Sequence, residues 1–345
     1  MNYYATFIPG LGELIAELVR ERLPDAIIHR LLDGAILFET SLGYDKLNFF
    51  CFNNIFAVIN LMEHDAPARA LEAHIQLQNA VVGDSAAGGI IAHNSRKFRS
   101  FRIVISRENK PASIDEKLRT EAERHIARLS GLTVNRAKPD AEFWFLYRNE
   151  GFSLFMKRLT LRPSWEKSLH PGELPPPLAW MLCRLARLKH DDVVLDPFCG
   201  YGSIPNAAFR YFHITQCIAA DNNEQAAAYT AARFRDRPDG AFTLHKTDFR
   251  SLVSILPPKS VDAIITDPPW GCYHNGEEFQ GALYEEMFGV FDTLLKDGGR
   301  VVVLGARTDE LPRADGDRFV LQENIPILLS GKKAAIYRFA PIKPA

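Results

Sequence analysis

A strict alternation of short apolar runs and helix-patterned segments constrains the second half of the chain more than any other feature. Strands are expected at residues 193–196, 215–220, 242–245, 261–266 and 300–304, and helices at residues 178–188, 204–211, 224–235 and 279–295. Strands and helices that alternate in this way form a parallel sheet with helices on both faces. The sequence therefore predicts an α/β fold with a doubly wound, Rossmann-like sheet over residues 178–345. Two antiparallel strands at residues 319–326 and 334–339 would close its edge.

The first half of the chain mixes strands and helices in another order. Over residues 1–61, strands are expected at residues 3–8, 26–30, 35–39 and 55–61, and helices at residues 13–23 and 44–52. This order predicts a small split β-α-β layer. Residues 62–160 predict a second α+β unit, with strands at residues 101–106, 141–147 and 152–159 and a helix at residues 114–129. Residues 161–177 are rich in proline and lack periodic apolar positions, which predicts a linker.

Composition argues against several classes of protein. The longest apolar runs are too short to span a bilayer, and residues 1–10 lack the basic and apolar stretches of an export signal. The five cysteines are odd in number and form no CxxC pair, so neither a disulfide framework nor a metal site is expected. We therefore expect a cytoplasmic protein without membrane contact.

A turn with two glycines follows the strand at residues 193–196 and opens a helix. It comprises Asp196, Pro197, Phe198, Cys199, Gly200, Tyr201, Gly202 and Ser203. Glycines let a backbone pass close to a ligand, although a tight connection without a ligand uses the same residues. The three-glycine pattern of dinucleotide sites is absent. This favours a ligand without a pyrophosphate, such as S-adenosylmethionine. Every residue of the turn except Tyr201 is a candidate cofactor-binding residue.

Acidic residues also follow the next two strands. Asp221 and Asn222 come directly after residues 215–220, where a ribose lies in a Rossmann-like crevice. Asp221 would then bind the ribose, whereas the structural alternative makes it the N-cap of the following helix. Asp248 and Phe249 follow the third strand. There they would offer an acceptor to an adenine amine and an aromatic edge to its ring.

The fourth strand ends in Asp267, Pro268, Pro269 and Trp270. Methyl transfer to an exocyclic amine requires acceptors that hold the amine hydrogens, and the Asp267 carboxylate and the Pro268 carbonyl can do this. The prolines fix the backbone, and Trp270 offers a flat face on which a flipped-out base can stack. The structural alternative is a proline-rich turn with a partly buried tryptophan. These four residues are our candidate catalytic residues.

The candidate nucleic-acid contacts are Arg96, Lys97, Arg99 and Arg102, which lie among phenylalanines within residues 95–102. The net charge of −1 gives no overall basic excess, so any such surface must be local. A solvated strand with buried phenylalanines would explain the same residues. The sequence after residue 162 contains no comparable basic cluster.

The turn at residues 196–202 and the motif at residues 267–270 resemble motifs I and IV of class I amino-methyltransferases, in the same order. The segment 169–174 (LHPGEL), followed by the turn, is similar to the THUMP-containing RNA guanine-N2 methyltransferases. Residues 4–7 resemble their ferredoxin-like opening and residues 101–159 a THUMP domain. Two departures are Tyr201 and Ser203, where the family usually shows serine and threonine. Aspartate with tryptophan in motif IV also resembles adenine-N6 methyltransferases.

The resemblance implies an enzyme that transfers a methyl group from S-adenosylmethionine to the N2 amine of a guanosine in tRNA. Residues 1–61 would be a ferredoxin-like domain and residues 62–160 a THUMP RNA-binding domain. The alternatives are an adenine-N6 or ribosomal RNA guanine-N2 methyltransferase, and a cofactor-binding RNA module without catalysis. We expect a monomer that binds tRNA. The sequence leaves open the nucleotide position, the number of methyl groups added and the need for a small activating protein.

Overall fold

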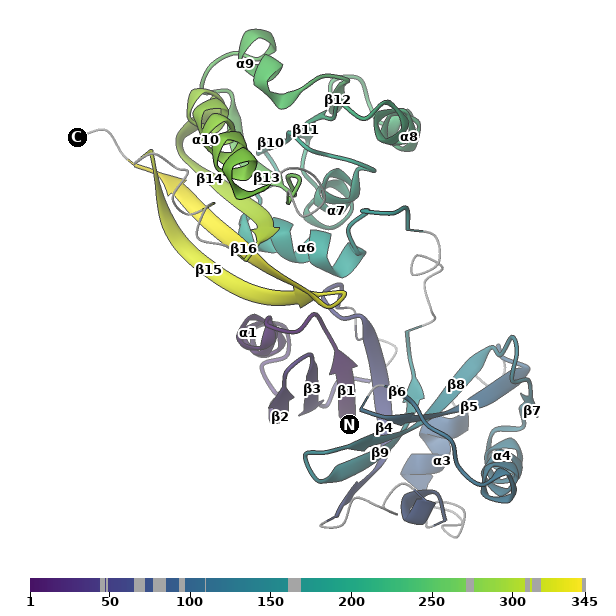
Figure 1. The fold of residues 1–345 in the computed structure, drawn as a ribbon. Coiled ribbons are helices and arrows are strands. Elements are labelled where there is room, and N and C mark those ends of the chain that lie inside the picture. Colours follow the sequence, from purple (N-terminus) through teal and green to yellow (C-terminus); the bar gives the residue numbers. More distant parts are fainter. Residues whose placement is uncertain are drawn as a thin grey trace. The chain divides into compact units, whose positions relative to one another are not determined.

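Figure 1 shows the computed structural model of the chain. The structure describes residues 1–43, 47, 49–64, 72–76, 85–92, 97–108, 110–160, 169–270, 276–307, 311 and 318–342. The chain divides into two compact units. Unit 1 comprises residues 1–7 and 12–163, and unit 2 comprises residues 8–11 and 164–345.

Unit 1 is built on one sheet with the strand order β2-β3-β1-β4-β9-β8-β5-β6, in which β7 also pairs with β5. Its strands are β1 (Asn2–Thr6), β2 (Ile27–Leu32), β3 (Ala35–Glu39), β4 (Asn54–Glu63), β5 (Ser100–Arg107), β6 (Lys110–Pro111), β7 (Thr133–Val134), β8 (Ala141–Arg148) and β9 (Phe152–Arg158). Its helices include α1 (Gly12–Arg22), α3 (Ser85–Ala92) and α4 (Glu116–Ser130). The predicted strands and the helices at residues 13–23 and 114–129 are therefore confirmed to within a few residues. The helix predicted at residues 44–52 lies largely outside the described residues.

One pairing joins the two segments that the sequence predicted as separate domains. β4, from the first segment, runs antiparallel to β9, from the second, with Phe56 opposite Arg158 and Glu63 opposite Phe152. The sheet of unit 1 is therefore continuous across residues 1–61 and 62–160. The assignment of these segments to ferredoxin-like and THUMP domains stays a prediction.

Unit 2 contains the predicted doubly wound sheet, with the strand order β12-β11-β10-β13-β14-β16-β15. Its strands are β10 (Val193–Asp196), β11 (Gln216–Ala220), β12 (Phe242–His245), β13 (Val261–Thr266), β14 (Leu295–Ala306), β15 (Phe319–Leu329) and β16 (Lys332–Pro341). The strands from β12 to β14 pair in parallel, and β16 and β15 are antiparallel. Its helices are α6 (Pro176–Leu185), α7 (Ser203–Phe212), α8 (Glu224–Phe234), α9 (Leu252–Ile255) and α10 (Gly276–Leu294), with a short helix η1 (Phe249–Ser251). The expected α/β fold is confirmed.

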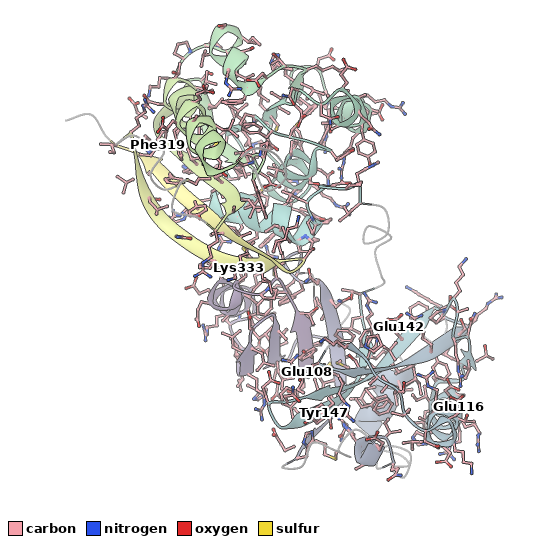
Figure 2. The ribbon with its side chains drawn as sticks, viewed as in Figure 1. Glu108, Glu116, Glu142, Tyr147, Phe319 and Lys333 are labelled. Atoms are coloured by element: carbon pink, nitrogen blue, oxygen red, sulfur yellow. The ribbon has the colours of Figure 1, made fainter. Side chains whose placement is uncertain are left out.

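The central strands β10, β11, β13 and β14 are buried on both faces, as strands with helices on either side require. Leu195, Ile264 and Val303 belong to one core cluster with the apolar side chains of α10. Phe288 of α10 packs on Phe319 of β15, which Figure 2 labels, and on Phe339 of β16; the ring centroids are 5.4 and 5.0 Å apart. In Figure 1, α6, α7 and α8 lie on the other side of the strands from α10. Packing on both faces fixes the positions of these strands, and with them the positions of their carboxyl ends at one edge of the sheet.

β10 lies between β11 and β13, so the connections from β10 and β13 leave the sheet in opposite directions at this point. Parallel α/β sheets bind ligands at such a switch point, at the carboxyl ends of their strands. Asp196 ends β10 opposite Ala219 of β11, and Thr266 ends β13. The fold therefore places the residues that follow these strands around one crevice.

Among the helices that the structure describes, none is both long and apolar enough to cross a membrane.

Candidate functional site

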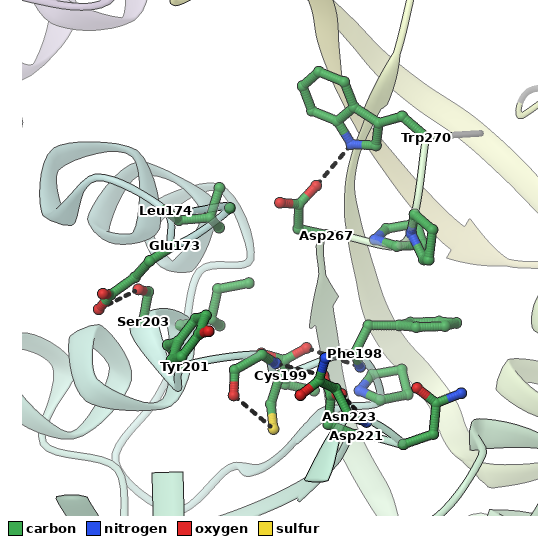
Figure 3. A pocket seen from close by; sticks show the side chains of 18 of the residues that line it. Glu173, Leu174, Phe198, Cys199, Tyr201, Ser203, Asp221, Asn223, Asp267 and Trp270 are labelled. Atoms are coloured by element: carbon green, nitrogen blue, oxygen red, sulfur yellow. Dashed lines mark hydrogen bonds between the residues drawn. The ribbon is translucent and has the colours of Figure 1, made fainter. Parts of the chain in front are cut away.

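A pocket of about 840 Å³ opens at the carboxyl edge of the unit 2 sheet. Its walls come from the residues after β10, β11, β12 and β13, from residues 169–175 before α6, and from the turn between β15 and β16 (Figure 3). All the lining residues belong to unit 2. The lining includes these predicted residues: Asp196, Pro197, Phe198, Cys199, Gly200, Ser203, Asp221, Asn222, Asp248, Phe249, Asp267, Pro268, Pro269 and Trp270.

The two glycines of the turn after β10 differ in what surrounds them. Gly200 has φ +48°, and a Cβ added to it would meet no atom within 4 Å. Gly202 has φ +76°, and a Cβ there would lie 2.9 Å from Phe234 and 3.1 Å from Thr230. Gly200 therefore leaves room for a ligand to lie against its backbone, whereas Gly202 lets the turn pack against α8. Gly202 does not line the pocket, contrary to our expectation that it contacts the cofactor.

Asp221 holds this turn in place. Its Oδ2 accepts a hydrogen bond from the Gly200 N–H at 2.7 Å, and its Oδ1 accepts one from the Asn223 N–H at 2.8 Å. The N-cap of α8 is Asn223, whose side chain accepts from the Ala226 N–H. The N-cap interpretation of Asp221 is therefore wrong. Its carboxylate faces the pocket between the turn and β11, where the ribose of an adenosine is expected.

Asp196 places a buried carboxyl group at the bottom of the crevice. Oδ1 accepts from the Phe198 N–H at 3.3 Å, and among the described residues Oδ2 is buried without a hydrogen-bond partner. Burial raises the pKa of Asp196 well above its usual range, and the nearby carboxylates of Asp221 and Asp267 raise it further. A cationic ligand would relieve this cost. S-adenosylmethionine fits the pocket in this respect, because it carries a sulfonium and an ammonium group.

The residues at the predicted adenine end have partners within the protein. Asp248 accepts from the backbone N–H of Arg250 at 3.0 Å and from its guanidinium at 3.1 Å. The Arg250 guanidinium also pairs with Glu286. Phe249 is buried and packs on Phe198, with ring centroids 4.9 Å apart. An adenine ring would therefore meet the edge of a fixed aromatic pair, beside a carboxylate that is already partly neutralised.

Residues 169–175, which the sequence assigned to a linker, form one wall of the pocket. Glu173 is buried and accepts hydrogen bonds from the His170 N–H at 3.1 Å and from Arg233 of α8 at 3.2 Å. Arg233 also donates to the Tyr201 carbonyl oxygen at 2.9 Å. The His170 ring stacks on Tyr201, with centroids 4.2 Å apart and planes 7° apart, and meets Tyr229 edge-on. These contacts tie the wall to the cofactor turn.

The sequence reasoning missed these wall residues because a proline-rich stretch shows no periodicity. The signal available was the resemblance of residues 169–174 to a family motif, which we used for the family and not for the site. The β15–β16 turn, which contributes Leu329, Ser330 and Lys332, was missed as well. Nothing in its local sequence marks it as part of a site.

Asp267 and Trp270 form a pair at the mouth of β13. The indole Nε1–H donates to Asp267 Oδ1 at 2.8 Å (Figure 3). Both side chains are partly buried, Pro268 is buried and Pro269 is exposed. Burial raises the pKa of Asp267 to about 7, although the hydrogen bond from Trp270 lowers it. The arrangement places a carboxyl group that titrates near neutral pH beside an aromatic ring. A carboxyl oxygen can accept a hydrogen bond from a base amine, and the ring can stack on the base.

The predicted nucleic-acid contacts lie in unit 1, and Arg96 is outside the described residues. Lys97 and Arg99 are exposed just before β5. Arg102 lies within β5 and forms an ion pair with Glu142, which also binds Arg158 at 3.1 Å. Lys97 and Arg99 thus keep the exposure that a phosphate contact needs, whereas Arg102 has a partner inside the unit.

Comparisons with known proteins agree with this geometry. A family model described as the RMKL-like methyltransferase domain matches residues 163–324. The crystal structure of TrmN from Thermus thermophilus superposes with a TM-score of 0.79 at 23% identity, over 99% of both chains. The fold and the pocket thus define a class I methyltransferase.

Three relatives in sequence are more specific. A tRNA (guanine(6)-N2)-methyltransferase of Thermus thermophilus is 28% identical over 74% of this chain and 86% of its own length. A probable tRNA (guanine(10)-N2)-dimethyltransferase of Methanothermococcus thermolithotrophicus is 30% identical over 38% of this chain and 80% of its own length. The chain spans only 59% of the tRNA (guanine(10)-N2)-dimethyltransferase of Methanothermobacter thermautotrophicus, at 28% identity over 56% of this chain. The chain belongs to the family of RNA guanine-N2 methyltransferases that these relatives represent.

Replacing Asp221 by alanine should weaken the binding of S-adenosylmethionine about 10- to 100-fold. The change removes the expected acceptor for the ribose and the bond that holds Gly200, and hydrogen bonds to a charged group contribute about 1.5–3 kcal/mol. Isothermal titration calorimetry measures the effect. Asp236→Ala is the control, because the side chain of Asp236 is 93% exposed. Unchanged affinity in Asp221→Ala would remove this residue from the site.

Replacing Arg233 by alanine should lower the stability of unit 2 by about 1–3 kcal/mol, because a buried carboxylate loses a partner. The side chain of Glu173 is only 6% exposed. The same change should lower the affinity for S-adenosylmethionine, because the carbonyl oxygen of Tyr201 in the cofactor turn loses the hydrogen bond that Arg233 donates. Thermal unfolding with and without the cofactor measures both effects. Arg235→Ala, at a side chain that is 75% exposed, should behave as the wild type. Equal unfolding temperatures for the two variants would contradict the role of Arg233.

Proposed function

We propose that this protein transfers the methyl group of S-adenosylmethionine to the exocyclic N2 amine of a guanosine in tRNA. The observation that carries the proposal is the Asp267–Trp270 pair in the same pocket as Asp196 and Asp221. A carboxylate beside an aromatic face suits a flat base with an amine. The names of the three relatives described above favour guanine N2 over adenine N6, and all three name tRNA as the substrate.

The protein's own residues divide the work between them. Asp196, Asp221 and the Gly200 backbone would hold S-adenosylmethionine, which supplies an electrophilic methyl group when bound. Asp267 would accept a hydrogen bond from the target amine and so direct the nitrogen lone pair into the pocket. Trp270 would stack on the base. Catalysis would then consist mainly of positioning.

Unit 1 is proposed to contribute most of the affinity for tRNA, through Lys97, Arg99 and neighbouring cations. We further propose that the protein acts in the cytoplasm as a monomer. A requirement for a small activating protein would show as inactivity of the purified chain on tRNA that it binds.

Mass spectrometry of nucleosides tests the proposal. Purified full-length protein is incubated with S-adenosylmethionine and unmodified tRNA, ribosomal RNA or an adenosine-rich oligonucleotide. The proposal expects N2-methylguanosine from tRNA. N6-methyladenosine, or N2-methylguanosine from ribosomal RNA alone, would favour the alternative enzymes. Cofactor binding without any methylated product, both from the purified chain and after addition of cell extract that could supply an activating protein, would favour a non-catalytic module.

The role of Asp267 predicts a distinctive pH profile. The ionised carboxylate is a stronger acceptor of an amine hydrogen than the protonated form, so the single-turnover rate should rise with pH and level off above pH 7. This follows from the pKa of Asp267, which burial raises to about 7. Asp267→Asn keeps a carbonyl acceptor that does not titrate, so it should retain part of the activity with a flat profile.

Asp267→Ala removes the acceptor altogether. Its rate should fall on the order of a hundredfold to a thousandfold, while tRNA affinity stays nearly intact because phosphate contacts dominate it. Filter binding and methylation assays on the same preparation separate the two quantities. Near-normal methylation by this variant would mean that the target is not an amine held by Asp267.

Trp270 has two separable roles that two substitutions distinguish. Trp270→Ala should lose about 1–3 kcal/mol of base stacking, together with the hydrogen bond to Asp267. Trp270→Phe should recover part of the stacking but not the bond. Because that bond lowers the pKa of Asp267, the midpoint of the Trp270→Phe pH profile should move upward. If neither variant loses affinity for tRNA and both keep the wild-type midpoint, the indole has neither role.

A further inference from the structure

Three exposed cations gather at the carboxyl edge of the unit 2 sheet. Arg307 directly follows β14, and Lys332 and Lys333 begin β16. The antiparallel pairing of these strands, with Ala306 opposite Ala334, brings the three together. The Arg307 N–H donates to the Lys333 carbonyl oxygen at 3.4 Å. Figure 2 shows Lys333 at the turn end of the β15–β16 hairpin. We call Arg307, Lys332 and Lys333 the basic rim.

Arg307 and Lys333 carry like charges on facing positions of the β14–β16 pairing. Like charges on facing positions of neighbouring strands repel one another. Within the described part of the chain, no carboxylate forms an ion pair with Arg307 or Lys333. Other cations of the same unit have such partners, as Arg250 has Asp248 and Lys296 has Asp262. An anionic ligand would remove the repulsion within the rim.

The basic rim borders the pocket, and the sheet fixes its position. Leu329, Ser330 and Lys332 line the same pocket as Asp267 and Trp270. Ser330 and Gly331 have φ values of +50° and +81°, as in the two-residue turns that join tightly paired strands. Lys332 is therefore placed by the paired strands and not by a long loop.

Charge divides the surroundings of the pocket into two halves. Asp196, Asp221 and Asp248 lie on the side of β10, β11 and β12. The basic rim lies on the other side of β13, beyond β14. A cationic cofactor suits the first half, whereas an RNA strand carries a phosphate on each side of every nucleotide and is repelled there. The basic rim attracts the strand that delivers a base to Asp267 and Trp270 from the opposite side of the pocket.

We propose that the basic rim binds the phosphate groups of the RNA strand next to the target nucleotide. This inference rests on the proposed function and adds a contact surface within the catalytic unit. The sequence after residue 162 shows no basic cluster, because Arg307 and Lys332 lie far apart along the chain. The pairing of β14 with β16 creates the cluster.

The test compares full-length variants that lose the same type of charge at different places. Arg307→Gln/Lys333→Gln removes two rim cations that do not line the pocket. Lys189→Gln is the matched control, since Lys189 is exposed and precedes β10 at the opposite edge of the sheet. Fluorescence anisotropy measures tRNA affinity over a series of KCl concentrations. Calorimetry with S-adenosylmethionine reports whether each variant is folded.

The slope of log K against log[salt] is negative, and each lost phosphate contact should reduce its magnitude by about 0.7–0.9. Each loss should also weaken binding roughly fivefold at 0.15 M salt. The double variant should therefore lose about 1.4–1.8 in slope and bind roughly 25-fold more weakly, with unchanged affinity for S-adenosylmethionine. Lys189→Gln should match the wild type.

Wild-type salt dependence and tRNA affinity in the double variant would overturn the rim proposal, as would an equal loss in Lys189→Gln. The proposed function would survive either result if the wild type still forms N2-methylguanosine. If the wild type neither binds nor methylates tRNA, both proposals are wrong.

Discussion

The parallel pairing of β10 with both β11 and β13 is the constraint on which the site depends. It brings Asp196, Asp221 and Asp267 to one edge of a buried sheet, although they are spread along the sequence. Burial disfavours the charge on Asp196 and Asp267, and the other two carboxylates disfavour it further on Asp196. The hydrophobic core holds these groups together against their repulsion, so a cation bound among them would be stabilised.

Much of this edge could be predicted from the sequence. Regular alternation of strands and helices gives the order of the elements, and a polar residue directly after a strand must lie at the strand's end. That reasoning located Asp221, Asp248 and Asp267 without any tertiary contact. It did not locate His170 and Glu173, because their positions depend on contacts with α8 and the cofactor turn, and a proline-rich segment gives no local sign of such contacts.

Other differences have the same origin. Gly202 and Gly200 look alike in sequence, yet only the packing of α8 decides which of them faces the ligand. Asn223, and not Asp221, is the N-cap of α8, because the Asp221 carboxylate accepts a hydrogen bond from the turn. In unit 1, the pairing of β4 with β9 joins residues far apart in sequence. Local periodicity finds each strand but not its neighbour, so the continuity of that sheet could not be read from the pattern.

Because the β15–β16 hairpin lies at the border of the sheet, substitutions in it have a different effect from substitutions in the central strands. The parallel strands from β12 to β13 carry the residues proposed to hold the methyl donor, and substitutions there disturb a core that is buried on both faces. The hairpin lies at the antiparallel border of the sheet, where only β14 adjoins it. Its turn can lengthen, shorten or change charge while the buried strands stay as they are. A change in the turn of this one hairpin could therefore alter the proposed RNA contact while the strands that carry the proposed cofactor residues stay the same.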